Sequence, residues 1–516
     1  MLYTSWRKNC LARWPKGKTI ILFLILFVFI YPVTAQNTLV INTLNEAKQL
    51  RNEKKLAQAA AILGAFEKKY PGNLWIEQLY AQTLFWLKKD NEAAVVYKRA
   101  IGFHPDNLDL KYDYAVMLFS ENKFEEAKEQ LLAYAKKKNN NADVEMLLGK
   151  IFFYQSQFKR AEKYLGRSVQ LNPDNQEVEN LYREVYRIVS PQLSLASGYI
   201  NDDQPMQSVG GALKFQWYAS DFLDFDVSGN VFNYLNIPNP GLIYTAQIGN
   251  RFTFRKAGLK LRLAGAWFYA GTNRARDWGG TIAVDKEFGK FFSLALEAER
   301  TNYTYTIASV NNNLLMMNQY SMDLSVGKTD SWNGKAGARY QFFPDDNYVS
   351  ALYAWFLSRP LNLSGFKISF GYAFNYMNSK EDRFQPKTSA IPFYSGGGQN
   401  NEKSIEGVYV PYYTPHQQYA NSVLVNFHFA VAKHADFYGH ASVGVFSKTY
   451  APGYYLLSGS GTPEKIFAYQ KYTPLDLGLD FQADISKKAA VSLSYAFLQT
   501  YYYNSHNVKV VFRFYF

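Results

Sequence analysis

Cysteine is nearly absent from this chain of 516 residues, and the one copy, Cys10, lies close to the N-terminus. Disulfides, thiolate metal sites and cysteine nucleophiles are therefore excluded from the rest of the chain. A His-Glu-x-x-His zinc motif and a phosphate-binding glycine loop are also missing. Charge of one sign is not concentrated, because 56 basic and 43 acidic residues are spread along the sequence. We expect no cofactor, no bound metal and no nucleic acid partner.

Long apolar runs are missing except at the start of the chain. Basic residues between Arg7 and Lys18 precede an apolar run from Thr19 to Tyr31, and the small residue Ala35 follows. This order of parts is typical of a secretory signal peptide. The run of 13 residues is shorter than the roughly 20 that a membrane-spanning helix needs. We predict a signal peptide over residues 1–35 and cleavage after Ala35, with an uncleaved anchor as the alternative.

Residues 40 to 175 repeat with a period of 34. Four blocks begin at Val40, Leu74, Leu108 and Ala142 and align without a gap. The eighth and twentieth positions hold only Ala or Gly, as in Ala81 and Ala93. Small side chains let two antiparallel helices approach closely. A proline at the thirty-second position ends the second helix of a block. These prolines are Pro71, Pro105 and Pro173, and Asn139 stands at this position in the third block.

This pattern resembles the tetratricopeptide repeat, with residues 176 to 189 as a capping helix. Such repeats generally bind proteins or peptides on a concave surface, so the resemblance implies a protein partner. A spacer, or a solenoid that packs on its own barrel, stays open as an alternative because a repeat fold does not fix function. We place this solenoid at residues 36–190.

From residue 191 to 516 the pattern alternates with a period of two. Apolar residues such as Leu259, Leu261 and Leu263 share one face, and the opposite face is rich in small and polar residues. Tyr and Phe are abundant, at 41 and 39 copies. Alternating strands with many aromatic residues favour a transmembrane β-barrel over a soluble sandwich. The predicted fold is therefore multidomain, α then β. An all-α tetratricopeptide solenoid is followed by an antiparallel transmembrane β-barrel.

Connectors of two lengths alternate along the predicted barrel. We count about sixteen strands, with fourteen as the alternative. Short connectors include 255–258 and 486–488, and long ones include 306–315, 380–417 and 451–464. Outer-membrane barrels have short periplasmic turns and long external loops. With sixteen strands both barrel ends are periplasmic, which predicts an outer-membrane barrel with its repeats in the periplasm.

The order of signal peptide, repeats and C-terminal barrel resembles the YaiO family of outer-membrane barrel proteins in a repeat-fused form. It is also similar to the exporter of poly-N-acetylglucosamine, in which repeats precede a sixteen-stranded barrel. The exporter likeness implies passage of a polysaccharide. Neither resemblance carries over a functional residue, because no site motif matches.

The alternation assigns many charged residues to the barrel lumen. Over the whole inward face, eight acids and nine bases are nearly balanced, so the lining predicts no selectivity for one charge sign. Cross-barrel ion pairs that brace the wall stay open as an alternative to a substrate path. The lumen candidates are Asp224, Asp226, Lys260, Arg262, Glu297, Glu299, Arg339, Asp476, Asp480 and Arg513.

The connector from Lys380 to Gln417 is unusually long. It carries Tyr409, Tyr412 and Tyr413, which are candidates for stacking on a ligand such as a sugar. The loop could fold inward and constrict the pore, or outward and bind a ligand. Structural packing of these tyrosines stays open as the alternative.

A membrane lipid hydrolase is a third hypothesis. Pairs two residues apart on one strand face, His428 with Asn426 and His440 with Ser442, are the candidates. Such pairs arise easily by chance in alternating strands, so we predict that the protein is not an enzyme.

The leading hypothesis is a translocation or secretion barrel, with a polysaccharide as one candidate cargo and a periplasmic protein docked on the repeats. The main alternative is a non-enzymatic adaptor whose barrel anchors a repeat scaffold in outer-membrane lipid. The last strand ends on Phe512, Phe514 and Phe516. We predict that these aromatic residues are the signal read by the barrel-assembly machinery.

Overall fold

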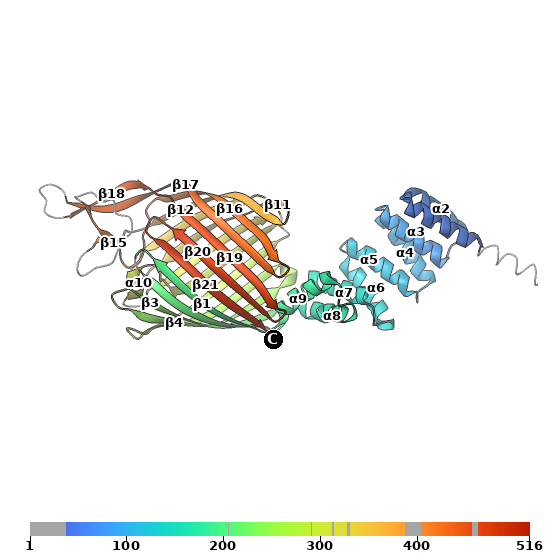
Figure 1. Cartoon of the computed structure of the whole chain (residues 1–516), viewed down its shortest axis with the longest axis horizontal. Coiled ribbons are helices and arrows are strands. Elements are labelled where there is room, and N and C mark those ends of the chain that lie inside the picture. The colour runs from blue at the N-terminus through green and yellow to red at the C-terminus, as the bar shows by residue number, and fades with distance from the viewer. Residues whose placement is uncertain are drawn as a thin grey trace, which may run out of the picture. The chain divides into compact units, whose positions relative to one another are not determined.

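The computed structural model describes residues 38–204, 206–289, 291–311, 314–327, 331–387, 404–456 and 463–516. The predicted signal peptide lies outside these residues. The chain divides into two compact units, Met1–Tyr182 and Arg183–Phe516, with the boundary inside the ninth helix. Figure 1 labels the elements of both units. Among the described residues, no helix is both long and apolar enough to cross a bilayer.

Nine helices make up the N-terminal part of the described chain. One covers residues 38–52. Three of the others, α3, α5 and α7, begin at Leu74, Leu108 and Ala142, where the sequence blocks begin, so the predicted tetratricopeptide-like repeats are confirmed. The labelled helices are α2 (Leu56–Lys69), α3 (Leu74–Trp86), α4 (Asp90–Phe103), α5 (Leu108–Ser120), α6 (Phe124–Lys137), α7 (Ala142–Tyr154), α8 (Phe158–Leu171) and α9 (Gln176–Val189).

The repeat sequence explains both the start of each helix pair and its close packing. Asn73 precedes α3, and its side chain accepts a hydrogen bond from the backbone N–H of Ile76, which caps the helix. At the eighth position of the fourth block, a Cβ on Gly149 would lie 2.6 Å from Cγ of Leu165. Only a very small residue fits between these two helices, as the repeat pattern predicts.

Sixteen antiparallel strands close into a barrel in the second unit, as the sequence predicts. The first and last strands pair with each other, with Leu195 opposite Phe512, so the sheet has no free edge. The strands are β1 (Gln192–Asp202), β2 (Gln207–Tyr218), β3 (Leu223–Leu235), β4 (Gly241–Phe254), β5 (Leu259–Ala270), β6 (Ala275–Phe288), β7 (Phe292–Asn302), β8 (Met316–Gly327), β9 (Asn333–Phe342), β10 (Tyr348–Leu357), β12 (Phe366–Ser379), β16 (Gln418–Ala432), β17 (Ala435–Leu456), β19 (Leu475–Ser486), β20 (Ala489–Gln499) and β21 (Asn504–Tyr515).

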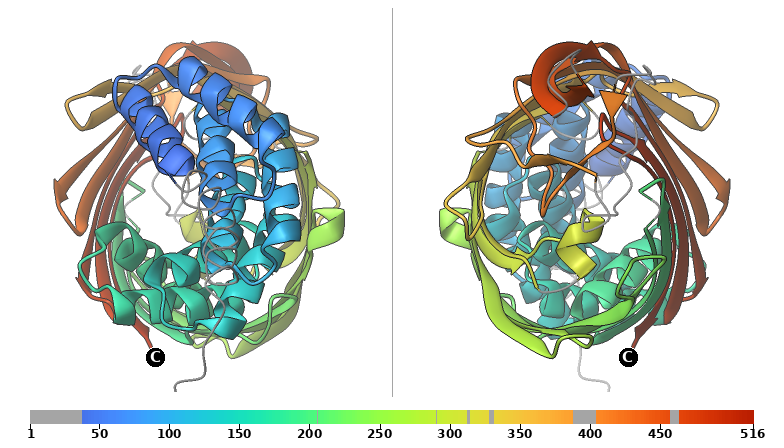
Figure 2. Two further views of the ribbon diagram at one scale, coloured as in Figure 1. Left: turned by 90° about the vertical axis from the view of Figure 1, so that its right-hand side faces the viewer. Right: turned by 90° about the vertical axis from the view of Figure 1, so that its left-hand side faces the viewer.

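The two ends of the barrel differ in their connectors. The chain enters β1 and leaves β21 at the same end, which we call the turn end. Its connectors are short, as at the 3₁₀ turn η1 (Arg255–Ala257) between β4 and β5. The opposite end, the loop end, carries the long connector between β12 and β16 and the short helix α10 (Ile307–Asn311). The right-hand view of Figure 2 looks at the loop end and shows α10 within the ring of strands.

One long connector is shorter than the sequence predicts. The prediction of a loop over residues 451–464 is wrong at both ends. Ala451–Leu456 continue β17, and Pro463 begins β18 (Pro463–Lys471). These two segments pair with each other, with Ala451 opposite Ala468. Alternation and aromatic content are weak at Ala451, Pro452 and Gly453, so the strand signal fades where the ladder continues. Four further short strands are β11 (Leu361–Leu363), β13 (Phe384–Pro386), β14 (Ser404–Ile405) and β15 (Gly407–Tyr409).

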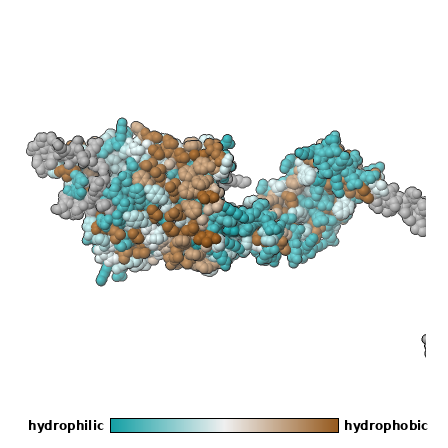
Figure 3. All heavy atoms as spheres, in the orientation of Figure 1, coloured by the Kyte–Doolittle hydropathy of each residue, from teal (hydrophilic) through white to brown (hydrophobic). Residues whose placement is uncertain are grey.

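The outer face of the barrel is apolar. Phe512 and Phe516 are 43% and 63% exposed, and they lie on the same outward face as Leu263 and Leu479. Figure 3 shows hydrophobic residues gathered in a broad band on the barrel surface. A closed antiparallel barrel with such a band is the architecture of outer-membrane proteins, because lipid replaces a buried core on that face.

Candidate functional site

The charged lumen candidates lie on the inward face of the strands. Each alternates with an outward apolar residue, as Arg262 does with Leu263 and Asp480 with Leu479. Asp224 and Asp226 come early on β3, Lys260 and Arg262 early on β5 and Arg513 late on β21, so these five lie in the turn-end half of the barrel. Glu299 and Asp476 lie toward the loop end, where they line a cavity. All ten candidates lie on the inward face: Asp224, Asp226, Lys260, Arg262, Glu297, Glu299, Arg339, Asp476, Asp480 and Arg513.

Several of these charges interact with neighbours in the wall. An Nη atom of Arg262 lies 3.8 Å from a carboxylate oxygen of Asp226, and Nζ of Lys260 lies 2.9 Å from Glu287. Asp480 accepts a hydrogen bond from Ser494. Arg513 donates to Ser492 across 3.3 Å. Such contacts join adjacent strands, or in the case of Asp226 and Arg262 the strands on either side of β4, and stabilise the wall. They leave fewer free charges facing the lumen.

The two histidines of the hydrolase hypothesis contact carboxylates. Nε2 of His428 lies 2.9 Å from Asp436, and Nε2 of His440 lies 3.3 Å from Asp476. In the described part of the chain, no hydrogen bond joins His440 to Ser442 or His428 to Asn426. No group of three or more possible metal-binding His, Cys, Asp or Glu residues occurs there either. A nucleophile next to its base, which acyl transfer needs, is not assembled at these residues.

Residues 407–416, which we call the mouth segment, cross the loop end of the barrel. On one side, Thr306 in the β7–β8 connector donates a hydrogen bond to the carbonyl of Pro411 over 2.5 Å. On the other side, Tyr409 packs edge-on against Tyr502 in the β20–β21 connector, with ring centroids 5.0 Å apart. These two connectors lie half a circumference apart in the strand order. The segment therefore contacts connectors from opposite sides of the barrel mouth.

The three candidate tyrosines of this loop pack against aromatic rings of other connectors. Tyr412 is fully buried and stacks on Phe343, with ring centroids 3.5 Å apart. Tyr409 is 4% exposed, and the ring of Tyr413 stacks on that of Tyr502 at 5.4 Å. Burial raises the pKa of all three phenols, so they stay neutral at physiological pH. In this arrangement their faces contact protein rather than a ligand.

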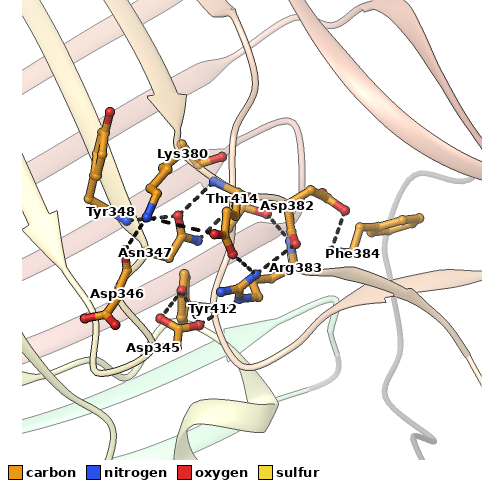
Figure 4. Close-up of polar contacts among 12 residues, drawn as sticks. Asp345, Asp346, Asn347, Tyr348, Lys380, Asp382, Arg383, Phe384, Tyr412 and Thr414 are labelled. Atoms are coloured by element: carbon orange, nitrogen blue, oxygen red, sulfur yellow. Dashed lines mark hydrogen bonds and ion pairs between the residues drawn. The ribbon is translucent and has the colours of Figure 1, made fainter.

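Charged residues fasten the start of the loop to its neighbours (Figure 4). The Arg383 Nε donates to Asp345 over 2.7 Å, and the Tyr412 hydroxyl donates to the same carboxylate over 2.7 Å. Asp382 pairs with Lys465 and lies 3.6 Å from Nε2 of His416. We call these six residues the loop clamp.

The loop clamp keeps its two acids ionised. Burial favours the protonated form of Asp345 and Asp382. Hydrogen bonds from Tyr412 and Arg383 to Asp345, and from His416 and Lys465 to Asp382, outweigh burial and hold the pKa of both carboxyls below the usual range. The ordered mouth segment therefore depends on two charged carboxylates.

A cavity of about 600 Å³ lies on the loop-end side of the lumen, among β1–β7 and β19–β21. It exists because inward positions of the wall are small: Ala266 lies beside Gly279 across β5 and β6. A Cβ on Gly279 would lie 2.8 Å from the Phe268 ring. Its lining includes Asn230, Thr245, Gln247, Thr281, Glu299 and Asn507 together with Phe232, Tyr234, Phe268, Tyr305 and Tyr503.

Several polar side chains of this cavity are unpaired. Among the described residues, Asn230, Thr245, Gln247 and Asn507 make no side-chain hydrogen bond within the protein. Asn230 lies opposite Thr245 on β4, and Thr245 lies opposite Phe268 on β5. The alternation places these residues inward but gives no reason to single them out, because the cavity depends on small neighbours on other strands.

Known proteins match the two units separately. The tetratricopeptide repeat family model matches residues 91–151. No curated protein sequence matches the chain.

Among solved structures, a bacterial polysaccharide outer membrane secretin has a TM-score of 0.47 at 11% identity, covering 64% of this chain and 99% of that chain. MamA from Desulfovibrio magneticus RS-1 has a TM-score of 0.27 at 15% identity, covering 27% and 80%. A tetratricopeptide repeat protein from Parabacteroides merdae has 0.27 at 14%, covering 28% and 59%. With no TM-score reaching 0.5, these likenesses carry no functional argument.

Acid should loosen the mouth segment. The folded-state pKa of Asp345 and Asp382 lies below the unfolded-state value, so their stabilisation is present at neutral pH. It is lost as pH falls through the ordinary carboxyl range, about pH 4, and below. A fluorophore on Glu406→Cys should lose anisotropy over this range.

The variant Arg383→Gln should show low anisotropy already at neutral pH, because it removes a charged hydrogen bond that stabilises the loop by about 1–2 kcal/mol. Lys471→Gln is the control, since it removes the same charge from the loop end and Lys471 has no ion pair in the described part of the chain. Equal pH profiles for Arg383→Gln and the unaltered chain would show that the loop clamp does not hold the segment.

Proposed function

We propose that this protein is an outer-membrane translocation or secretion component whose repeats dock a periplasmic protein partner. The observation that carries the proposal is the polar lining of the lumen. Unpaired polar side chains line a cavity on the loop-end side of the lumen, where the mouth segment contacts connectors from opposite sides of the barrel. A protein that used its barrel only as an anchor would have no need for unpaired hydrogen-bonding groups inside it.

The proposed orientation follows from the connectors. Short connectors are typical of the periplasmic end of an outer-membrane barrel, and long ones of its external end. The turn end would then face the periplasm, the signal peptide would direct export, and the repeats that precede β1 would lie in the periplasm. Phe512, Phe514 and Phe516 would present the insertion signal to the barrel-assembly machinery from the same end.

We propose a polysaccharide as the cargo. The charged lumen residues of both signs are nearly balanced, and part of them pair within the wall. A polyanion or polycation would be better served by a lining biased to the opposite sign. From the order of signal peptide, repeats and barrel, we also propose that the chain is related to the YaiO family of outer-membrane barrel proteins.

A non-enzymatic adaptor is the alternative, and the mouth segment favours it. A barrel with a clamped loop at its mouth could serve only to anchor the repeats in the membrane.

Removing residues 40–175 tests the export proposal. The variant should insert a folded barrel but release no surface polysaccharide, because the partner that delivers the cargo can no longer dock. Secreted polysaccharide and folded barrel are measured together in cells. The control is Lys471→Gln in the full-length chain. Unchanged secretion beside a normally inserted barrel would exclude the proposed role of the repeats.

A further inference from the structure

The cavity beside the mouth segment combines donors, acceptors and aromatic rings on one inner wall. Asn230 and Gln247 each offer an amide that both donates and accepts, and Thr245 between them offers a hydroxyl. None of these three side chains has a hydrogen-bond partner among the described residues. Phe268 lies in the same rung as Thr245, and Phe232 faces Ile243 two residues away. Polar groups and aromatic rings are therefore neighbours on this inner wall.

The charges around the cavity are engaged, with one exception. Arg300 donates to both carboxylate oxygens of Asp277 at 3.0 Å and to the carbonyl of Trp278 at 2.9 Å. Asp202 accepts from the backbone N–H of Gln204 and Met206. Asp476 contacts His440.

Glu299 is the exception, because its carboxylate has no hydrogen bond and no ion pair within 4.0 Å in the described chain, although Arg262 and Arg339 act on it electrostatically from farther away. Among the residues that line the cavity, an anionic ligand would therefore meet no unpaired cation and one carboxylate without a direct partner. A hydroxyl group can donate to that carboxylate without bringing a charge of its own into the lumen.

We propose that this cavity is a binding site for uncharged, hydroxyl-rich sugar units, with Asn230, Thr245, Gln247 and Glu299 bonding the hydroxyls. The rings of Phe232 and Phe268 pack against the apolar face of a sugar. A volume of about 600 Å³ lies within the usual range for a small-molecule site. The site rests on the proposed export function and adds to it the class of cargo, a neutral glycan.

The test measures binding to the purified full-length protein in detergent by calorimetry. The neutral probes are maltohexaose, cellohexaose and the hexamer of N-acetylglucosamine. The charged probes are the hexamers of glucosamine and of galacturonate. At least one neutral hexamer should bind, and more tightly than both charged ones. The double variant Asn230→Ala/Gln247→Ala should bind it about tenfold more weakly, because two hydrogen bonds are lost.

Gln216→Ala is the matched control. It removes the same kind of inward amide from β2, opposite Asp226 and outside the cavity, and it should leave the affinity unchanged. Thr245→Val is a second, nearly isosteric variant that should also weaken binding and keeps the proposal testable if the double variant does not fold. Heat-modifiable electrophoretic mobility reports folding of each barrel.

Three results would overturn the assignment: no binding of any neutral hexamer, tighter binding of a charged hexamer, or an equal loss in Gln216→Ala. Binding also separates this site from the proposed export function. The chain lacking residues 40–175 should keep the full affinity for the neutral hexamer. If that chain binds the sugar but still secretes polysaccharide, the docking role fails while the binding site stands.

Discussion

A barrel without its mouth segment should form a stable, conducting pore in a planar bilayer. The variant replaces residues 381–416 by a short Gly-Ser linker between Lys380 and Gln417. It removes the hydrogen bond between Thr306 and Pro411 and the contact between Tyr409 and Tyr502. These contacts join the segment to connectors from opposite sides of the barrel mouth. With them gone, ions should cross a lumen that is lined by polar residues.

The control for this experiment lacks only residues 388–403. This deletion keeps the residues that make the described contacts of the mouth segment, so conductance should stay at the level of the unaltered chain. Open events several-fold larger in the first variant alone are the expected result. Silence in both variants would mean that the lumen is blocked elsewhere, which would favour the adaptor function over translocation.

The second large effect concerns the last residue. Phe516→Ala should leave most of the protein outside the outer membrane, because it removes the terminal aromatic side chain of the proposed insertion signal. Phe516 is 63% exposed, and its backbone N–H bonds to the carbonyl of Pro191 at 3.0 Å. Its ring thus contributes little to the internal packing of the barrel. A loss of insertion would therefore reflect recognition during assembly rather than a weaker folded state.

Two controls separate these causes. Phe516→Tyr keeps an aromatic ring and should insert almost normally. Val508→Ala shortens an outward apolar residue on the same strand and should also insert. The measurement is the amount of folded barrel in the outer-membrane fraction. Normal amounts of Phe516→Ala would argue against a periplasmic C-terminus and so against the proposed topology.

The sequence predicts the repeats in detail because their determinants are local. Asn73 caps a helix that begins one residue later, and Gly149 contacts Leu165 only sixteen positions on. The strands of the barrel wall are predicted equally well, because their period of two follows from the geometry of a single strand. The strand pattern fails where it weakens, at Ala451 to Gly453, where β17 runs on beyond the ring, and in the long connector, where β13, β14 and β15 form.

The candidate site is less visible in the sequence. The inward charges follow from the alternation, but the loop clamp joins Asp345, Asp382 and Lys465 from three separate connectors and strands. The aromatic residues of the long loop suggested a ligand surface, whereas Tyr409 and Tyr412 are buried among other rings. Their environment depends on residues far along the chain, which no local pattern reports.

The sequence alone determined the two units, the spacing of the helices, the closed wall and the apolar outer face that ends on Phe516. These features depend on periods of 34 and of two, which each segment carries by itself. Only the tertiary structure decided that residues 407–416 contact connectors from opposite sides of the barrel mouth and that unpaired amides line a cavity on the loop-end side of the lumen. Closing the ring brings connectors half a circumference apart within reach of one segment, and that proximity exists only once the last strand has paired with the first.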